Sequence, residues 1–135
     1  MISKISILLI EEDLPLQHTL AYIFRRGGFE VVSAAPDLNV LSLLAEYSFD
    51  LIVLGLNQSS DIGLSLFLKI KKDHPLLPVI LLSANPETDV VPGLNDEIGW
   101  MLIQKPFEPS FLFKSVSAIT GGSLKHESQL IEVVA

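Results

Sequence analysis

The sequence contains no cysteine, which excludes disulfide bonds, catalytic thiols and thiolate-bound metals. Basic residues are also scarce, because 9 Lys and Arg stand against 16 Asp and Glu and give a formal net charge of −7. A nucleic-acid surface normally requires clustered Lys and Arg. The one dense basic cluster, Lys69, Lys71 and Lys72, is typical of a solvated helix end. Direct binding of nucleic acid is therefore not expected.

Long hydrophobic runs are missing too. Hydrophobic residues make up 49% of the 135-residue chain, yet no segment approaches the ~18 apolar residues that a membrane helix requires. The apolar start is broken by Glu11, Glu12 and Asp13, and no cleavage-site pattern follows. We therefore expect one compact domain in the cytoplasm, without a membrane anchor.

Five short apolar runs account for much of the hydrophobic content. Most of them do not alternate with polar residues, which is typical of strands covered on both faces of a parallel sheet. The predicted strands are Ile5–Ile10, Glu30–Ala34, Leu51–Leu54, Val79–Leu82 and Met101–Ile103.

The segments between these runs have the apolar spacing of helices. Their boundary signals are Gly27-Gly28 after the first helix, Asp37 as a cap of the second, and His74-Pro75 after the third. A short fourth helix is expected from near Pro92, and the last is expected from about Glu108 to Thr120.

This alternation of strands and helices predicts an α/β fold, with a doubly wound five-stranded parallel sheet and helices on both faces. A flavodoxin-like strand order, 2-1-3-4-5, places a crevice at the carboxyl ends of the first and third strands. Residues 1–120 would form this domain, and residues 121–135 a C-terminal tail or the start of a linker.

Polar residues follow the predicted strands. Glu11 and Glu12 follow the first strand, Asn57 the third, Ser83 the fourth and Lys105 the fifth. In a parallel sheet these side chains converge on one rim. Carboxylates, a hydroxyl and an ammonium group there could hold a divalent cation and a phosphoryl-like anion.

Four motifs resemble the receiver domains of two-component response regulators, the CheY-like family. ILLIEEDLPLQHTL resembles the opening strand, acidic pair and first helix of that family, and FDLIVLGLNQSSDIG its phosphorylation strand and loop. PVILLSA resembles the strand that ends in a hydroxyl residue, and LIQKPF the Lys-Pro signature. The resemblance covers about residues 3–120.

The resemblance implies roles for individual residues. Glu11 and Glu12 match the acidic pair that holds Mg²⁺, and Asn57 matches the residue whose backbone carbonyl is a metal ligand. Ser83 matches the hydroxyl that contacts the phosphoryl group, and Lys105 matches the lysine that neutralises it.

Several positions depart from the family pattern. Gly55 stands where the family has its phospho-accepting aspartate, and glycine is neither a nucleophile nor a side-chain metal ligand. Leu102 replaces an aromatic residue that reports phosphorylation, and Ser59 replaces a proline. Pro106 follows Lys105 through a peptide bond that is often cis in the family. Trp100, Leu102 and Pro106 are expected on an interaction surface.

These departures predict an atypical receiver, not an enzyme, that acts by phosphorylation-independent protein–protein interaction. Lys105 would pair with Glu11 or Glu12 in place of a metal; a solvated lysine and a weak Mg²⁺ site are the alternatives. No other cofactor is expected. The expected partners are a histidine kinase, a phosphotransfer or output protein, an attached output domain, or a second copy through the fourth helix, fifth strand and fifth helix.

The sequence leaves two other functions as alternatives. A phosphorelay receiver with a non-standard acceptor would have to use Glu11, Glu12 or Asp13. A small flavodoxin-like ligand-binding protein would need a Gly-rich phosphate loop after the first strand, where this chain has three acidic residues.

Overall fold

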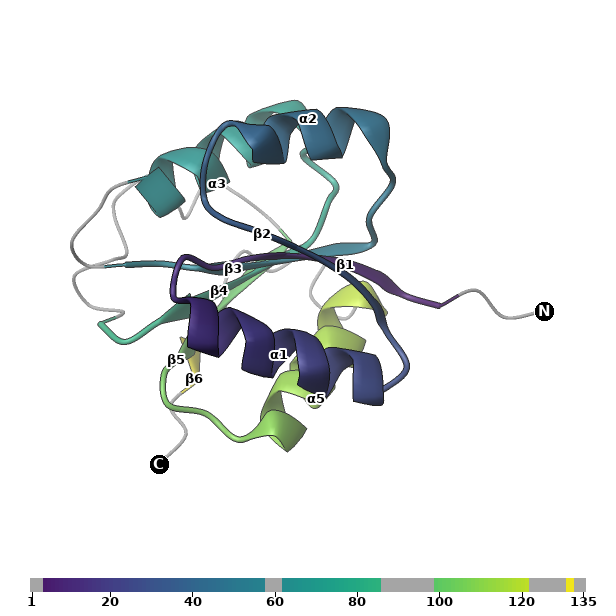
Figure 1. Ribbon diagram of the computed structural model, residues 1–135, viewed down its shortest axis with the longest axis vertical. Helices are drawn as coiled ribbons and strands as arrows, with labels where there is room; N and C mark the ends of the chain where they lie inside the picture. The colour runs from purple at the N-terminus through teal and green to yellow at the C-terminus, as the bar shows by residue number, and fades with distance from the viewer. Residues whose placement is uncertain (1–3, 58–61, 86–98, 122–130, 133–135) are drawn as a thin grey trace.

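The structure is a computed structural model that describes residues 4–57, 62–85, 99–121 and 131–132. A parallel sheet runs through its centre in the order β2-β1-β3-β4-β5-β6 (Figure 1). The strands are β1 Ser6–Ile10, β2 Glu30–Ala34, β3 Leu51–Gly55, β4 Val79–Ser83, β5 Trp100–Gln104 and β6 Ile131–Glu132. The predicted five-stranded sheet of order 2-1-3-4-5 is therefore confirmed, and β6 adds a short sixth strand beside β5.

Helices cover both faces of the sheet. In Figure 1, α2 and α3 lie on one side, while α1 and α5 lie on the other. Their bounds are α1 Leu14–Arg26, α2 Asn39–Glu46, α3 Ile62–Asp73 and α5 Pro109–Thr120. The fourth helix expected near Pro92 lies outside the described residues.

Alternate residues of the central strands serve two separate cores. Leu8 and Ile52 belong to a cluster with buried residues of α2 and α3, whereas Ile7 and Leu51 belong to a cluster with buried residues of α1 and α5. Because successive strand residues point to opposite faces, a strand between two helical layers must be apolar at every position. This explains why β1 and β3 read as unbroken apolar runs.

The first helix starts with a side-chain cap, whereas the second does not. Asp13 accepts a hydrogen bond from the Leu16 amide at 3.2 Å and caps α1. The prediction that Asp37 caps the second helix is wrong, because Leu38 is the N-cap of α2 and makes no side-chain capping bond. Asp37 lies one residue earlier and accepts a hydrogen bond from the Asn39 amide at 2.8 Å.

Three expectations about exposure are wrong. Lys71 is 1% exposed, and its Nζ donates to the carbonyl oxygens of Pro75 at 3.0 Å and Leu77 at 2.9 Å, so it is not part of a solvated helix end. Trp100 and Leu102 are 1% and 0% exposed, so these two side chains do not form an interaction surface. Trp100 lies edge-on to another aromatic ring of the core, and bulky apolar side chains gain most by such burial.

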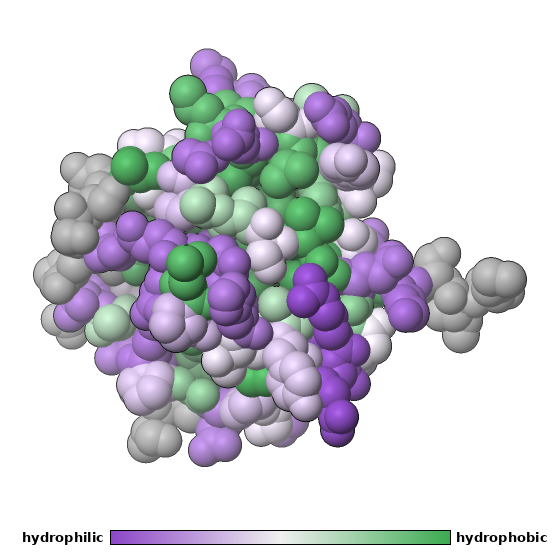
Figure 2. All heavy atoms as spheres, viewed as in Figure 1, coloured by the Kyte–Doolittle hydropathy of each residue, from purple (hydrophilic) through white to green (hydrophobic). Residues whose placement is uncertain are grey.

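Apolar atoms also reach the surface over the layer of α2 and α3, in the upper half of Figure 2. Leu38 and Ile62, 77% and 55% exposed, line a groove of about 500 Å³ between these helices. Within the described residues, no helix is both long enough and apolar enough to span a bilayer.

Candidate functional site

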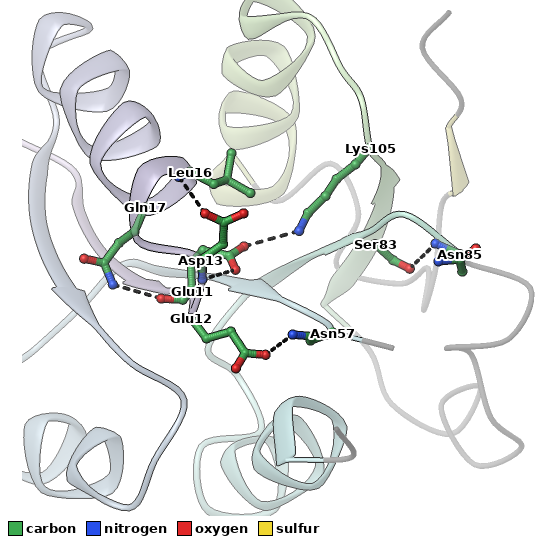
Figure 3. Close-up of polar contacts among 9 residues, drawn as sticks. All are labelled: Glu11, Glu12, Asp13, Leu16, Gln17, Asn57, Ser83, Asn85 and Lys105. Atoms are coloured by element: carbon green, nitrogen blue, oxygen red, sulfur yellow. Dashed lines mark hydrogen bonds and ion pairs between the residues drawn. The ribbon is translucent and has the colours of Figure 1, made fainter. Parts of the chain in front are cut away.

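The parallel register brings four strand ends to one edge of the sheet. Ile10 lies opposite Leu54, and Gly55 lies opposite Leu82. Ser83 at the end of β4 lies opposite Gln104, which directly precedes Lys105. The residues that follow β1, β3, β4 and β5 are thereby gathered as the sequence predicted (Figure 3).

Glu11 is the centre of this edge and is 3% exposed. Its Oε1 lies 3.3 Å from Lys105 Nζ, and its Oε2 accepts a hydrogen bond from the Asp13 amide at 3.0 Å. Of the two carboxylates considered for Lys105, Glu11 is thus the one that pairs with it. The Lys105 side chain retains 22% exposure, so the pair lies at the rim of the core and not inside it.

Gln17 holds the backbone beneath Glu11. Its side-chain amide donates to the Glu11 carbonyl at 2.9 Å and to the Ala34 carbonyl at 3.3 Å, which ties α1 to the ends of β1 and β2. Gln17 is not among the residues predicted for the site from the sequence. A signal was available, because Gln17 shares a helix face with Leu20 and Phe24 at spacings of three and seven residues.

Glu11 also occupies the space next to Gly55. A Cβ atom built on Gly55 would lie 2.7 Å from Glu11 Cδ and 3.2 Å from Glu11 Oε2. Among the described glycines only Gly28 and Gly99 have positive φ, so the backbone does not require glycine at position 55. In this arrangement the end of the Glu11 side chain occupies the space that a side chain at position 55 would take.

Glu12 and Asn57 form a second contact at the same edge. The Asn57 side-chain amide donates to Glu12 Oε1, and both residues are exposed. Mg²⁺ requires oxygen ligands in near-octahedral geometry. Glu11 faces Lys105, Gly55 supplies no side-chain ligand, and the described residues contain no cluster of three or more His, Asp or Glu side chains able to hold a metal. The described side chains, as arranged, do not fit a Mg²⁺ site.

Ser83 and Pro106 complete the edge. Ser83 is fully buried, and its Oγ accepts a hydrogen bond from the Asn85 amide at 2.9 Å. The peptide bond between Lys105 and Pro106 is cis, as the family resemblance implies. Pro106 is exposed, in contrast to Trp100 and Leu102. The Ser83 hydroxyl thus bonds to the backbone of the residues that follow β4.

Two known proteins with similar sequences are named as a respiration control protein and a probable transcriptional regulator. The aerobic respiration control protein ArcA of Escherichia coli K12 is 31% identical over 104 residues, which are 76% of this chain and 43% of ArcA. The probable transcriptional regulator ycf29 of Pyropia yezoensis is 30% identical over 127 residues, 92% of this chain and 57% of that protein. The chain thus spans about half the length of these relatives.

The fold is shared with solved receiver structures. The receiver domain of NtrX from Brucella abortus superposes with a TM-score of 0.71 at 25% identity, covering 85% of this chain and 98% of that one. The family described as response regulator receiver domain matches residues 7–117. This chain belongs to that family, and is therefore a two-component signalling domain and not a classical enzyme.

Proposed function

We propose that this receiver acts through phosphorylation-independent binding of protein partners. The observation that carries the proposal is the position of the Glu11 carboxylate, which fills the space beside Gly55 where a side chain at position 55 would lie. Position 55 matches the position of the phospho-accepting aspartate in the family. Glycine cannot form an acyl phosphate, since it has no side-chain carboxylate.

The Glu11–Lys105 pair supports the same conclusion electrostatically. Lys105 matches the lysine that neutralises a phosphoryl group, and here its ammonium lies 3.3 Å from a buried carboxylate. A carboxylate that is almost excluded from water requires a nearby cation or hydrogen-bond donors. Lys105 and the Asp13 amide meet that need without a metal or a phosphate. The arrangement favours a single constitutive conformation.

The partners belong to the proposal as well. Receiver domains interact with kinases and with output proteins, and the two curated relatives are longer than this chain, which matches 43% and 57% of their lengths. We expect a histidine kinase, a phosphotransfer protein, an output protein or an attached output domain as the partner, in the cytoplasm. A homodimer through the fourth helix, β5 and α5 remains an alternative, although the fourth helix lies outside the described residues.

The test is thermal unfolding with and without Mg²⁺ plus beryllofluoride. We expect no change in the melting temperature of the wild-type protein. The variant Glu11→Asp/Gly55→Asp shortens the obstructing carboxylate and restores an aspartate at the acceptor position, so we expect the ligands to stabilise it. Gly55→Asp alone is the matched control, and its response should be weaker because Glu11 keeps its full length. Stabilisation of the wild-type protein would refute the proposal.

A second candidate function is phosphorylation of Glu11 itself. Its carboxylate lies close to Lys105 and to the acceptor position, which favours it over Glu12 and Asp13 as a substitute acceptor. Its 3% exposure leaves little room for an incoming phosphodonor. Mass spectrometry after treatment with a small phosphodonor distinguishes the two functions. Phosphorylation-independent binding requires an unmodified protein. An added phosphoryl group that is absent from Glu11→Gln would establish phosphorylation of Glu11.

A further inference from the structure

The two edges of the five-stranded sheet, β2 and β5, are covered in different ways. On the β2 side, the Arg25 guanidinium donates to the outward carbonyl of Val31 at 3.0 Å. On the β5 side, the segment Ile131–Glu132 pairs in parallel with β5 (Figure 1). An unpaired edge strand is a template for pairing with another chain, and proteins commonly cover or cap it.

The hydrogen bonds between β4 and β5 fix which backbone groups of β5 face outward. The Val79 amide donates to the Gly99 carbonyl at 3.0 Å, and the Lys105 amide donates to the Ser83 carbonyl at 2.8 Å. Residues 99 and 105 therefore face β4. Because backbone polar groups alternate sides along a strand, Leu102 faces away from β4, toward β6.

The register then orients β6. Leu102 lies opposite Ile131, and Ile103 lies opposite Glu132. In a parallel ladder, a residue whose N–H and C=O point toward the neighbouring strand bonds to two residues of that strand. These are the residues just before and just after its register partner. Glu132 thus directs its backbone N–H and C=O to β5, between Leu102 and Gln104. Ile131 directs its own backbone groups away from β5.

We infer that the outer edge of β5 is a strand-docking site, occupied by this chain's own segment Ile131–Glu132, which shields the edge from pairing with a second copy. Four of the five β5 residues are buried, so an open edge would expose backbone groups beside an apolar core. The docked strand has two residues and β5 has five. A two-residue ladder is short enough to be displaced, and its removal leaves a longer edge for self-association. This inference does not depend on the acceptor site.

The experiment compares two proline variants in the full chain. Glu132→Pro removes the N–H that faces β5, whereas Ile131→Pro removes an N–H that faces away from β5, a position at which proline is tolerated on an edge strand. Amide hydrogen exchange is measured at Gln104, whose N–H faces β6, and at Ile103, whose N–H faces β4. Light scattering after size-exclusion chromatography gives the oligomeric state of each variant.

We expect exchange at Gln104 to accelerate in Glu132→Pro by about tenfold or more, which corresponds to a loss of about 1.4 kcal/mol of local stability. Ile131→Pro should leave it unchanged, and Ile103 should stay protected in both variants. Glu132→Pro alone should self-associate. Docking is refuted if the Gln104 amide exchanges as fast in wild type as in Glu132→Pro. The orientation of β6 is refuted if both proline variants accelerate that exchange equally. The shielding role is refuted if Glu132→Pro stays monomeric.

Discussion

The carboxylate of Glu11 lies where a side chain on Gly55 would have to be. A Cβ atom at position 55 would come within 2.7 Å of Glu11 Cδ, which is closer than carbon atoms approach without a clash. Glu11 itself is held on one side by Lys105 and on the other by the Asp13 amide. The long side chain of Glu11 and the absence of a side chain at Gly55 are therefore complementary. A substitution at one of these positions changes which residues fit at the other.

Gly55→Ala should destabilise the protein, although alanine suits the backbone better than glycine does. The added methyl group must displace the Glu11 carboxylate, which is the end of a flexible side chain. The cost should therefore lie near the lower end of the about 1–3 kcal/mol that overpacking costs. Chemical denaturation of the wild type and the variant gives the change in the free energy of unfolding.

The control for this prediction is a double-mutant cycle with Glu11→Asp. The shorter side chain opens space beside position 55, so Gly55→Ala should cost less in that background, with a coupling energy of about 0.5–3 kcal/mol. Additive costs for the two substitutions would contradict the proposed complementarity.

The sequence predicted this site only in part, and the reasons are physical. Gly55 was recognisable as the position without an acceptor, and Lys105 as a cation in need of an anion. Which acidic residue pairs with it was not decidable, because Glu11 and Glu12 both follow β1 and side-chain direction depends on the local backbone. Gln17 was missed because a glutamine on a helix ordinarily reads as exposed, whereas here its amide bonds two strand-end carbonyls.

Lys105→Met should destabilise the protein because it leaves the Glu11 carboxylate buried without its cation. Breaking a fully buried ion pair costs about 3–5 kcal/mol, and the 22% exposure of the Lys105 side chain places the expected loss below that range. Thermal and chemical unfolding both measure the effect.

Lys114→Met is the matched control, because Lys114 is exposed on α5 and its loss should change stability by no more than about 0.5 kcal/mol. The pair Glu11→Gln/Lys105→Met should be more stable than Lys105→Met alone, since the uncompensated charge is gone. Equal stabilities of the single and double variants would show that the unpaired Glu11 charge is not what destabilises Lys105→Met.

Gln17→Ala should cost about 1–3 kcal/mol, the range for leaving buried polar groups without a hydrogen bond. The Ala34 carbonyl keeps the bond from the Glu11 amide at 3.1 Å, so the Glu11 carbonyl should account for most of the loss. Thr19→Ala, at an exposed position two residues along α1, is the control in the same denaturation series. A loss no larger than that of Thr19→Ala would mean that Gln17 does not hold the site backbone.

The fold was more predictable than the exposure of its residues. Apolar runs and glycine or proline breaks located the five main strands, because strands between two helical layers are apolar throughout. The strand β2 is partly exposed because it lies at the edge of the sheet. Its sequence alone does not indicate that position. The pairing of β6 with β5 was not predictable, because it joins segments that are distant in the sequence. The two residues of β6 are also too few for a periodic signal.

Lys71→Met should destabilise the protein, whereas Lys72→Met should not. Lys71 is 1% exposed and its Nζ donates to the Pro75 and Leu77 carbonyls, so methionine keeps the apolar stem but leaves those acceptors without their ammonium donor, at a cost of about 1–3 kcal/mol. Lys72 is its exposed neighbour on α3, and there the change should stay within about 0.5 kcal/mol. Urea denaturation of the two variants tests this, with amide exchange of Leu77 as a local readout of the loop after α3. Equal stabilities would mean that the loop carbonyls find other donors, and that burial of Lys71 reflects packing of its stem alone.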